Sequence, residues 1–186
     1  MKYHADQAGG ANDRVLLLSP ISTQRISVIR VVIVDDVSTV RMALKQILTT
    51  DGDMQVVGQG RHGRDAVALV HDLRPDIVLM DVDMPQMDGL EATERIMSES
   101  ATPILIVTSS AVYDARGMPF SAIESGALDV FPKPSITDNR SWQNVGDRLR
   151  RTVRTLSRVK VVSRRRKRQD NQSPAPARHG VLESPV

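Results

Sequence analysis

The chain has 186 residues, the length of one domain with tails and enough to bury a hydrophobic core, so two full enzyme domains are excluded. It contains no cysteine, which excludes a disulfide framework and a thiolate zinc site and fits a reducing cytoplasm. The formal net charge of +3 is unevenly distributed. Residues 148–168 hold eleven Lys and Arg and no acid, so the remainder, with 14 basic and 22 acidic residues, carries −8.

The first 27 residues lack sustained periodicity and predict a poorly ordered extension. The apolar run at residues 28–34 falls far short of the roughly 20 residues that span a bilayer, and no signal peptide pattern precedes it. We therefore expect a cytoplasmic protein without membrane insertion.

From residue 28 onward, short apolar runs alternate with segments of helical periodicity. The runs predict strands at about 29–34, 54–58, 76–81, 103–107 and 128–131. The segments between them predict helices that include residues 40–48, 66–73, 88–99 and 119–125, and a longer apolar stripe runs from Trp142 to Val159. Runs such as Ile77–Met80 are apolar throughout, as strands covered by helices on both faces must be. The pattern predicts an α/β fold with a doubly wound, five-stranded parallel sheet.

Polar side chains gather at the predicted strand ends. Strand one ends in Asp35 and Asp36, and strand three ends in Asp81. Strand four ends in Thr108, and strand five leads into Lys133. These ends form one edge of the sheet, where doubly wound folds bind their ligands. Carboxylates so close together raise one another's pKa unless a cation neutralises them, and oxygen ligands with room for water suit Mg²⁺.

Taken one at a time, these residues have ordinary structural explanations. An Asp at a strand end usually caps a helix or a turn, while a single Thr or Lys there is an unremarkable surface or strand-end residue. However, four of the five predicted strands deliver a polar group to the same edge, and their interiors are apolar. This joint placement favours a functional site.

The same residues and their neighbours resemble the signature of response-regulator receiver domains. The resemblance covers residues 28–137 and rests on Val34-Asp35-Asp36, Asp81-x-x-Met84-Pro85-x-Met87-Asp88-Gly89, Thr108 and Lys133-Pro134. It implies a flavodoxin-like (CheY-like) receiver fold with Mg²⁺ as cofactor. It also implies that Asp36 binds the metal directly, that Asp35 is its outer acidic partner, and that Asp81 and the backbone carbonyl of Asp83 complete the protein ligands.

The resemblance further implies a phosphorelay function. Asp81 is the expected phosphoacceptor, which takes a phosphoryl group from a sensor histidine kinase. Thr108 is expected to turn toward that group, and Lys133 to pair with it. The cation and the ammonium would neutralise charge on the phosphoryl oxygens during transfer.

One position departs from the family pattern. Many receivers have Tyr or Phe three residues before the lysine, where this chain has Val130. The adjacent Phe131 is expected to point to the opposite face of its strand, since side chains alternate, and so to be no substitute. This puts the aromatic switch of the family in doubt.

Several stretches narrow the resemblance to the receiver half of the chemotaxis protein-glutamate methylesterase (CheB) family. They are residues 54–58, 88–97, 126–129 and 156–162. The implied partners are a chemotaxis-type histidine kinase and an esterase effector domain. The chain itself has no Gly-x-Ser-x-Gly elbow and no available Ser-His-Asp triad, so we expect a receiver without enzyme activity of its own.

The expected organisation has four parts. They are an extension (1–27), a receiver domain (28–137), an extended final helix with the start of a linker (138–162), and a basic, Pro-rich, disordered tail or linker remnant (163–186).

Other functions fit less of the sequence. The glycines of Gly58-Gln59-Gly60-Arg61-His62-Gly63 have dinucleotide-binding spacing but follow the second strand, so we interpret them as serving a tight turn and close helix packing. A calcium loop at Asp81 lacks the required third ligand and glycine. A stand-alone or transcription-type regulator, whose basic run Arg164–Arg168 binds nucleic acid or another partner, stays an alternative. We do not expect nucleic-acid binding, because the 48 residues after Asp138 are too few for a helix-turn-helix module.

Overall fold

The computed structural model describes residues 27–109, 118–133 and 139–163. The expectations for the first 26 residues, for Pro134 and for the tail from residue 164 concern residues outside these ranges. Within the described part of the chain, no helix combines the length and the apolar character needed to cross a membrane.

Five parallel strands form one sheet in the order β2-β1-β3-β4-β5. Their bounds are β1 Ile29–Val34, β2 Met54–Gly60, β3 Ile77–Met80, β4 Ile104–Thr108 and β5 Asp129–Pro132. All five predicted strands are therefore present. The chain order reverses at β1, with β2 on one side and β3 on the other, and this reversal marks the point where such sheets bind ligands.

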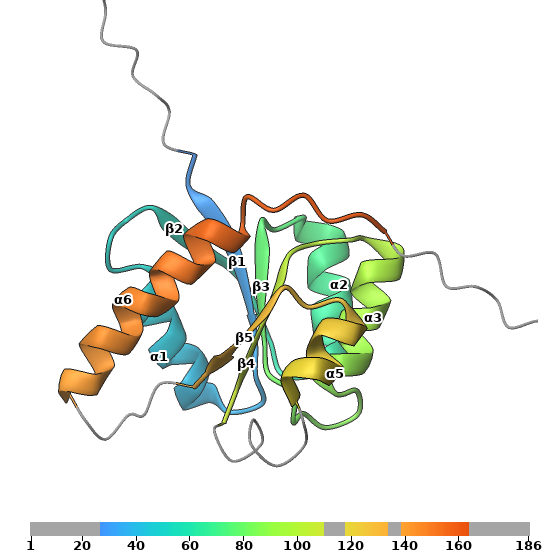
Figure 1. Cartoon of the computed structure of the whole chain (residues 1–186), viewed down its shortest axis with the longest axis horizontal. Coiled ribbons are helices and arrows are strands. Elements are labelled where there is room, and N and C mark those ends of the chain that lie inside the picture. Colours follow the sequence, from blue (N-terminus) through green and yellow to red (C-terminus); the bar gives the residue numbers. More distant parts are fainter. Residues whose placement is uncertain (1–26, 110–117, 134–138, 164–186) are drawn as a thin grey trace, which may run out of the picture.

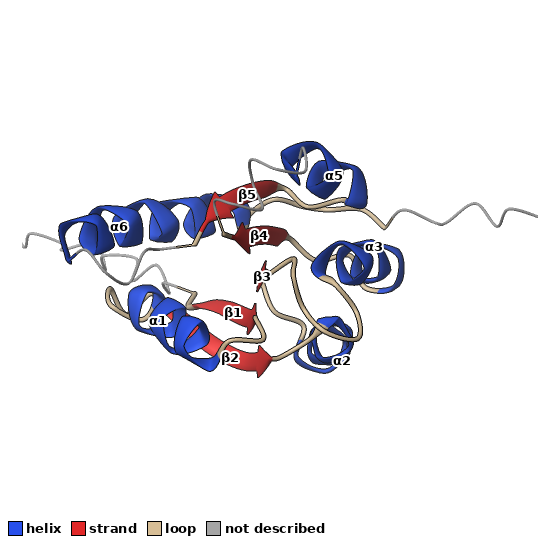
Figure 2. Cartoon of the chain, turned by 90° about the horizontal axis from the view of Figure 1, so that it is seen from below, coloured by secondary structure: helices blue, strands red, loops and turns tan. Residues whose placement is uncertain are grey.

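Helices cover both faces of the sheet, with α1 and α6 on one face and α2, α3 and α5 on the other (Figure 2). Their bounds are α1 Ser38–Leu48, α2 Gly63–Leu73, α3 Gly89–Glu99, α5 Met118–Ser125 and α6 Asn139–Leu156. Alternate residues of β1 serve the two layers, since Val32 and Val34 belong to one hydrophobic core and Val31 and Ile33 to the other. The doubly wound α/β prediction is confirmed.

The strand β2 is longer than predicted and runs through Gly60. Gly58 and Gly60 therefore lie within the strand, and the predicted tight turn follows them at Arg61 and His62, the two residues between β2 and α2. A Cβ on Gly58 would lie 2.8 Å from Leu73 Cδ1, and one on Gly60 would lie 2.8 Å from Asp65 Cβ. Both neighbours belong to α2. The close helix packing that the sequence predicted is thus confirmed as the reason for these glycines.

The last helix is shorter than its apolar stripe predicts. α6 ends at Leu156, and Val159 lies beyond it with 39% of its surface exposed. The residues after the helix cross the amino-terminal end of the sheet, from α6 to α3 (Figure 1). We call residues 157–163 the strap.

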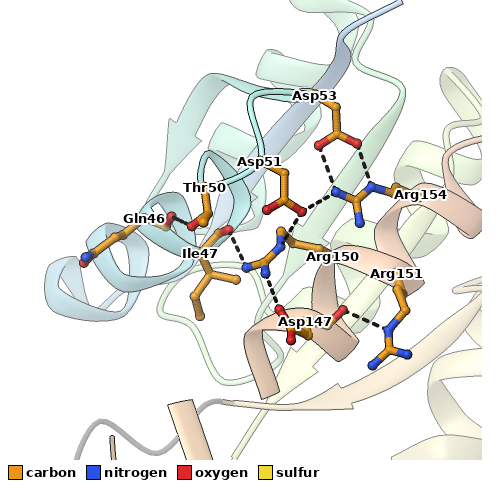
Figure 3. Close-up of polar contacts among 9 residues, drawn as sticks. All are labelled: Gln46, Ile47, Thr50, Asp51, Asp53, Asp147, Arg150, Arg151 and Arg154. Carbon is orange, nitrogen blue, oxygen red and sulfur yellow. Dashed lines mark hydrogen bonds and ion pairs between the residues drawn. The ribbon is translucent and has the colours of Figure 1, made fainter. Parts of the chain in front are cut away.

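An ion network holds α6 against the turn between α1 and β2 (Figure 3). Arg154 donates two hydrogen bonds to Asp53, from Nε to Oδ2 at 2.6 Å and from Nη2 to Oδ1 at 3.1 Å. Arg150 donates to Asp51 Oδ2 at 2.8 Å and to the carbonyl of Ile47 at 3.2 Å, near the end of α1. The hydrogen bonds from Arg154 hold the pKa of both carboxyl groups below its usual range.

Replacing Asp53→Asn should lower the free energy of unfolding at pH 7 by about 0.5–1 kcal/mol, a small loss because solvent screens the partly exposed pair. Since folding lowers the pKa of Asp53, its contribution is present above the unfolded value of about 4 and is lost as the pH falls through the folded value. Urea unfolding should show a larger difference at pH 7 than at pH 3. Asp72→Asn, which removes an exposed carboxylate from α2, is the control. An equal loss at both pH values would contradict the electrostatic role.

Candidate functional site

The carboxyl ends of β1 and β3 bring two aspartates together near the middle of the sheet edge. Asp35 and Asp81 directly follow the paired residues Val34 and Met80, and the Asp81 N–H donates to the Val34 carbonyl at 2.8 Å. Asp35 is 1% exposed and Asp81 is 4% exposed. Two carboxylates buried side by side are unfavourable unless a positive charge compensates them.

Lys133, immediately after β5, supplies that charge. Its Nζ lies 2.8 Å from Asp35 Oδ2 and 2.8 Å from Asp81 Oδ2. Its backbone N–H donates to the carbonyl of Thr108 at 2.8 Å, which continues the β4–β5 pairing to the sheet edge. The backbone therefore fixes the lysine where its ammonium reaches both carboxylates.

Thr108 is the last residue of β4 and is 1% exposed. Within the described part of the chain, its Oγ1 has no hydrogen-bond partner. A buried hydroxyl in that state costs free energy, and a bound ion, water or ligand is the usual explanation. This strand end therefore holds a hydroxyl that a ligand could engage.

Three carboxylates form a candidate metal site. Oxygens of Asp35, Asp36 and Asp81 lie within 4.8 Å of one another, and Asp36 differs from the other two in being exposed. Hard oxygen ligands in a partly open group fit Mg²⁺, which keeps several of its waters. Asp83 is exposed on the loop after β3, and the role of its carbonyl stays a prediction.

The Asp88-Gly89 pair shapes the site without lining it. Asp88 Oδ1 caps α3 by accepting from the Glu91 N–H at 2.8 Å. A Cβ on Gly89 would lie 1.9 Å from the backbone oxygen of Asp81, so a side chain cannot fit there. The glycine thus allows the first turn of α3 to pack directly against the backbone of Asp81. The sequence motif did not reveal this packing role.

Burial and neighbouring charges act in opposite directions on the two central groups. Burial raises the pKa of Asp81 to about 6, with a smaller upward contribution from Asp35, while Lys133 opposes the rise. Burial alone would lower the pKa of Lys133, but its hydrogen bonds with Asp35 and Asp81 outweigh that effect and raise it. The ammonium therefore stays charged at neutral pH.

Arg41 is a positioning residue that the sequence interpretation missed. Its Nη1 donates to the backbone carbonyl of Asp35 at 2.6 Å, while Asp35 Oδ1 accepts from the Val37 N–H at 2.9 Å. These bonds fix the turn from β1 into α1. A single arginine within a helix belongs to no recognisable sequence motif, so this contact could be found only from the structure.

The two residues at the aromatic-switch position point to opposite faces, as predicted. Val130 packs against the core that lies under α2 and α3, whereas Phe131 is 2% exposed in the other core. The Arg148 guanidinium lies 5.2 Å from the centroid of the Phe131 ring. Phe131 therefore packs in the core beneath α1 and α6 and does not replace the aromatic ring that is absent at residue 130.

The sheet order and the acidic edge with its lysine are those of a receiver domain. Residues 31–140, more than half of the chain, match the family model described as the response regulator receiver domain. The chain belongs to this family.

Similar proteins include methylesterases and the CheB receiver of this family. Protein-glutamate methylesterase/protein-glutamine glutaminase 3 of Hahella chejuensis is 40% identical over 153 residues, which cover 80% of this chain and 44% of that protein. The response regulator domain of Thermotoga maritima CheB has a TM-score of 0.64 and 34% identity, covering 72% of this chain and 98% of that one. A chain in the complex of a CheA3 domain with CheY6 from R. sphaeroides has a TM-score of 0.59 and 34% identity, covering 70% of this chain and 97% of that chain.

The chain spans less than half the length of the curated methylesterases that it matches. It is CheB-like in its receiver portion, as the sequence resemblance implied.

Asp81→Asn should stabilise the metal-free protein at pH 7.5. Because folding raises the pKa of Asp81, the free energy of unfolding falls as the pH rises from about 4 to about 6, and the cost persists above that window. The amide removes this cost, with a gain of at most roughly 3 kcal/mol that solvent screening reduces. Urea unfolding in EDTA should show the gain at pH 7.5 and almost none below pH 4. A mutant less stable than wild type at pH 7.5 would show that the Lys133 ion pair outweighs the burial.

Proposed function

We propose that the chain is a phosphoacceptor receiver, phosphorylated on Asp81 by a sensor histidine kinase in a Mg²⁺-dependent reaction. The observation that supports this most directly is the position of the Lys133 ammonium, 2.8 Å from both Asp35 and Asp81. A buried acid and ammonium beside an open carboxylate form a pocket suited to a phosphoryl group and a cation.

In the proposed reaction, an Asp81 carboxylate oxygen attacks the phosphorus of a phosphohistidine. A new P–O bond forms, the P–N bond breaks, and the donor imidazole leaves as the product. Lys133 pairs with a phosphoryl oxygen, and the Thr108 hydroxyl donates to another. Asp35, Asp36, Asp81 and the Asp83 carbonyl would hold Mg²⁺, which when bound supplies charge neutralisation for the phosphoryl oxygens.

We also propose that the chain acts as the regulatory domain of a chemotaxis methylesterase and has no esterase activity of its own. The CheB-like relatives support this, and the CheA3–CheY6 complex supports a chemotaxis-type kinase as the donor. The proposed setting is the cytoplasm. The proposed output surface lies over β4, β5 and α5, where Phe120 is 71% exposed and Ile123 is 49% exposed.

The phosphoacceptor assignment predicts one adduct. Wild type incubated with acetyl phosphate and Mg²⁺ should gain the mass of a phosphoryl group, and EDTA should prevent it. Asp81→Asn should abolish the adduct because the amide is not a nucleophile. Mass spectrometry of the intact protein measures the yield, with Asp72→Asn as a control that should behave as wild type. An adduct of equal yield in Asp81→Asn would refute the assignment.

The metal assignment predicts a stability response. Saturating Mg²⁺ should raise the melting temperature, corresponding to about 1–3 kcal/mol at tens to a hundred times the dissociation constant. Asp36→Asn should remove most of this response and, without metal, should be neutral or stabilising, since it relieves repulsion among the carboxylates. Calorimetry with and without Mg²⁺ checks both parts. A mutant that melts lower in EDTA and still responds fully to Mg²⁺ would contradict this pocket.

A further inference from the structure

The Asp36 carboxylate depends on the backbone for its position. It is the exposed carboxylate of the candidate metal site. In the part of the chain that the structure describes, no hydrogen bond or ion pair holds its side chain. Asp35 and Asp81 differ, because the Lys133 ammonium lies 2.8 Å from an oxygen of each. The place of the Asp36 carboxylate therefore follows from the peptide bond that joins Asp36 to Asp35.

Asp35 is held through its backbone as well as its side chain. Its N–H donates to the Gly60 carbonyl, at the end of β2, at 3.2 Å. Its Oδ1 accepts from the Val37 N–H at 2.9 Å, and its carbonyl accepts from Arg41 Nη1 at 2.6 Å. Because a peptide bond is planar, a fixed carbonyl at Asp35 also fixes the N–H and the Cα of Asp36. Arg41 therefore holds the main chain that carries the Asp36 carboxylate.

The charge of Arg41 acts against a cation in this site. Arg41 is half-buried in the first turn of α1, where its N–H donates to the Val37 carbonyl at 3.2 Å. Its guanidinium stays close to the acidic edge, since it bonds to the backbone of Asp35. Two positive charges repel each other, so the guanidinium by its charge alone weakens Mg²⁺ binding. A favourable effect of Arg41 on the metal must come from the geometry that it imposes.

We propose that Arg41 raises the affinity of the site for Mg²⁺ by holding the peptide bond from which the Asp36 carboxylate extends. The inference rests on the proposed metal site and adds a residue that acts through Asp36 and is not itself a ligand. Removing a group that orients a metal ligand typically weakens metal binding about 10–100-fold. Arg41 is in this sense a positioning residue.

Mg²⁺ titrations of the full chain, followed by NMR, test this role. Arg41→Met removes the donor and the charge and keeps a long side chain. Its dissociation constant for Mg²⁺ should rise about tenfold, although the loss of a positive charge alone should lower it. Arg61→Met is the matched control, because Arg61 is an exposed arginine that lines the same hollow of about 560 Å³ as Arg41. This control should bind Mg²⁺ as tightly as wild type, or more tightly.

Two further measurements identify the route. In an Asp36→Asn background, Arg41→Met should weaken Mg²⁺ binding by less than about twofold, because the carboxylate that it positions is gone. The amide signal of Asp36 should shift in Arg41→Met and stay in place in Arg61→Met, since it belongs to the peptide bond that Arg41 holds. If Arg41→Met does not fold, Arg41→Gln, which also removes the charge and shortens the side chain, replaces it with the same expectations.

The outcomes separate this inference from the metal site on which it rests. Mg²⁺ binding by Arg41→Met that equals or exceeds wild type would overturn it, as would an equal loss in Arg61→Met. A loss that persists undiminished in the Asp36→Asn background would show that Arg41 acts on another ligand, and would equally overturn it. These results leave the metal site standing, because wild type and Asp36→Asn alone decide that assignment. No Mg²⁺ binding by wild type would refute the metal site and this inference together.

Discussion

Two almost fully buried carboxylates share one sheet edge because a single ammonium lies 2.8 Å from each. Asp35 comes from β1 and Asp81 from β3, but Lys133 arrives after β5, two strands further along the sheet. The site therefore exists only when the parallel strands are assembled in the observed order. Burial outweighs the ion pair at Asp81 and raises its pKa, whereas at Lys133 the two ion pairs outweigh burial and raise the pKa of the ammonium.

The helix α3 connects the two ends of the sheet. Its first residue, Gly89, touches the backbone of Asp81, and its last turn receives the hydrogen bond from the strap. α6 is held separately, by arginines that reach the turn before β2. The candidate phosphoacceptor and the strap thus act on opposite ends of one helix, while the α1–α6 layer has its own attachment.

Much of the fold was predictable because buried parallel strands and amphipathic helices leave strong periodic signals. The strand-end residues Asp35, Asp81 and Lys133 were predictable for the same reason, since parallel strands bring their carboxyl ends to one edge. The length of β2 was not, because Gly58 and Gly60 mimic a turn while serving the approach of α2. The end of α6 was missed because Val159 continues the apolar spacing past the helix. Arg41 and the strap act through backbone carbonyls, which no side-chain pattern reports.

The contact between Gly89 and Asp81 has a consequence for how mutational data on this protein should be interpreted. A Cβ at residue 89 meets a main-chain oxygen at 1.9 Å, so substitutions there are rejected for lack of space, whatever the protein is selected to do. The exposed Asp36 is under no such steric restriction. A library sorted only for folded protein would retain glycine at residue 89 and accept many residues at 36, while the proposed metal role of Asp36 predicts that one sorted for signalling would restrict both. Intolerance to substitution at Gly89 therefore reports a packing requirement of the fold. Only a difference between the two selections identifies a residue that is needed for function.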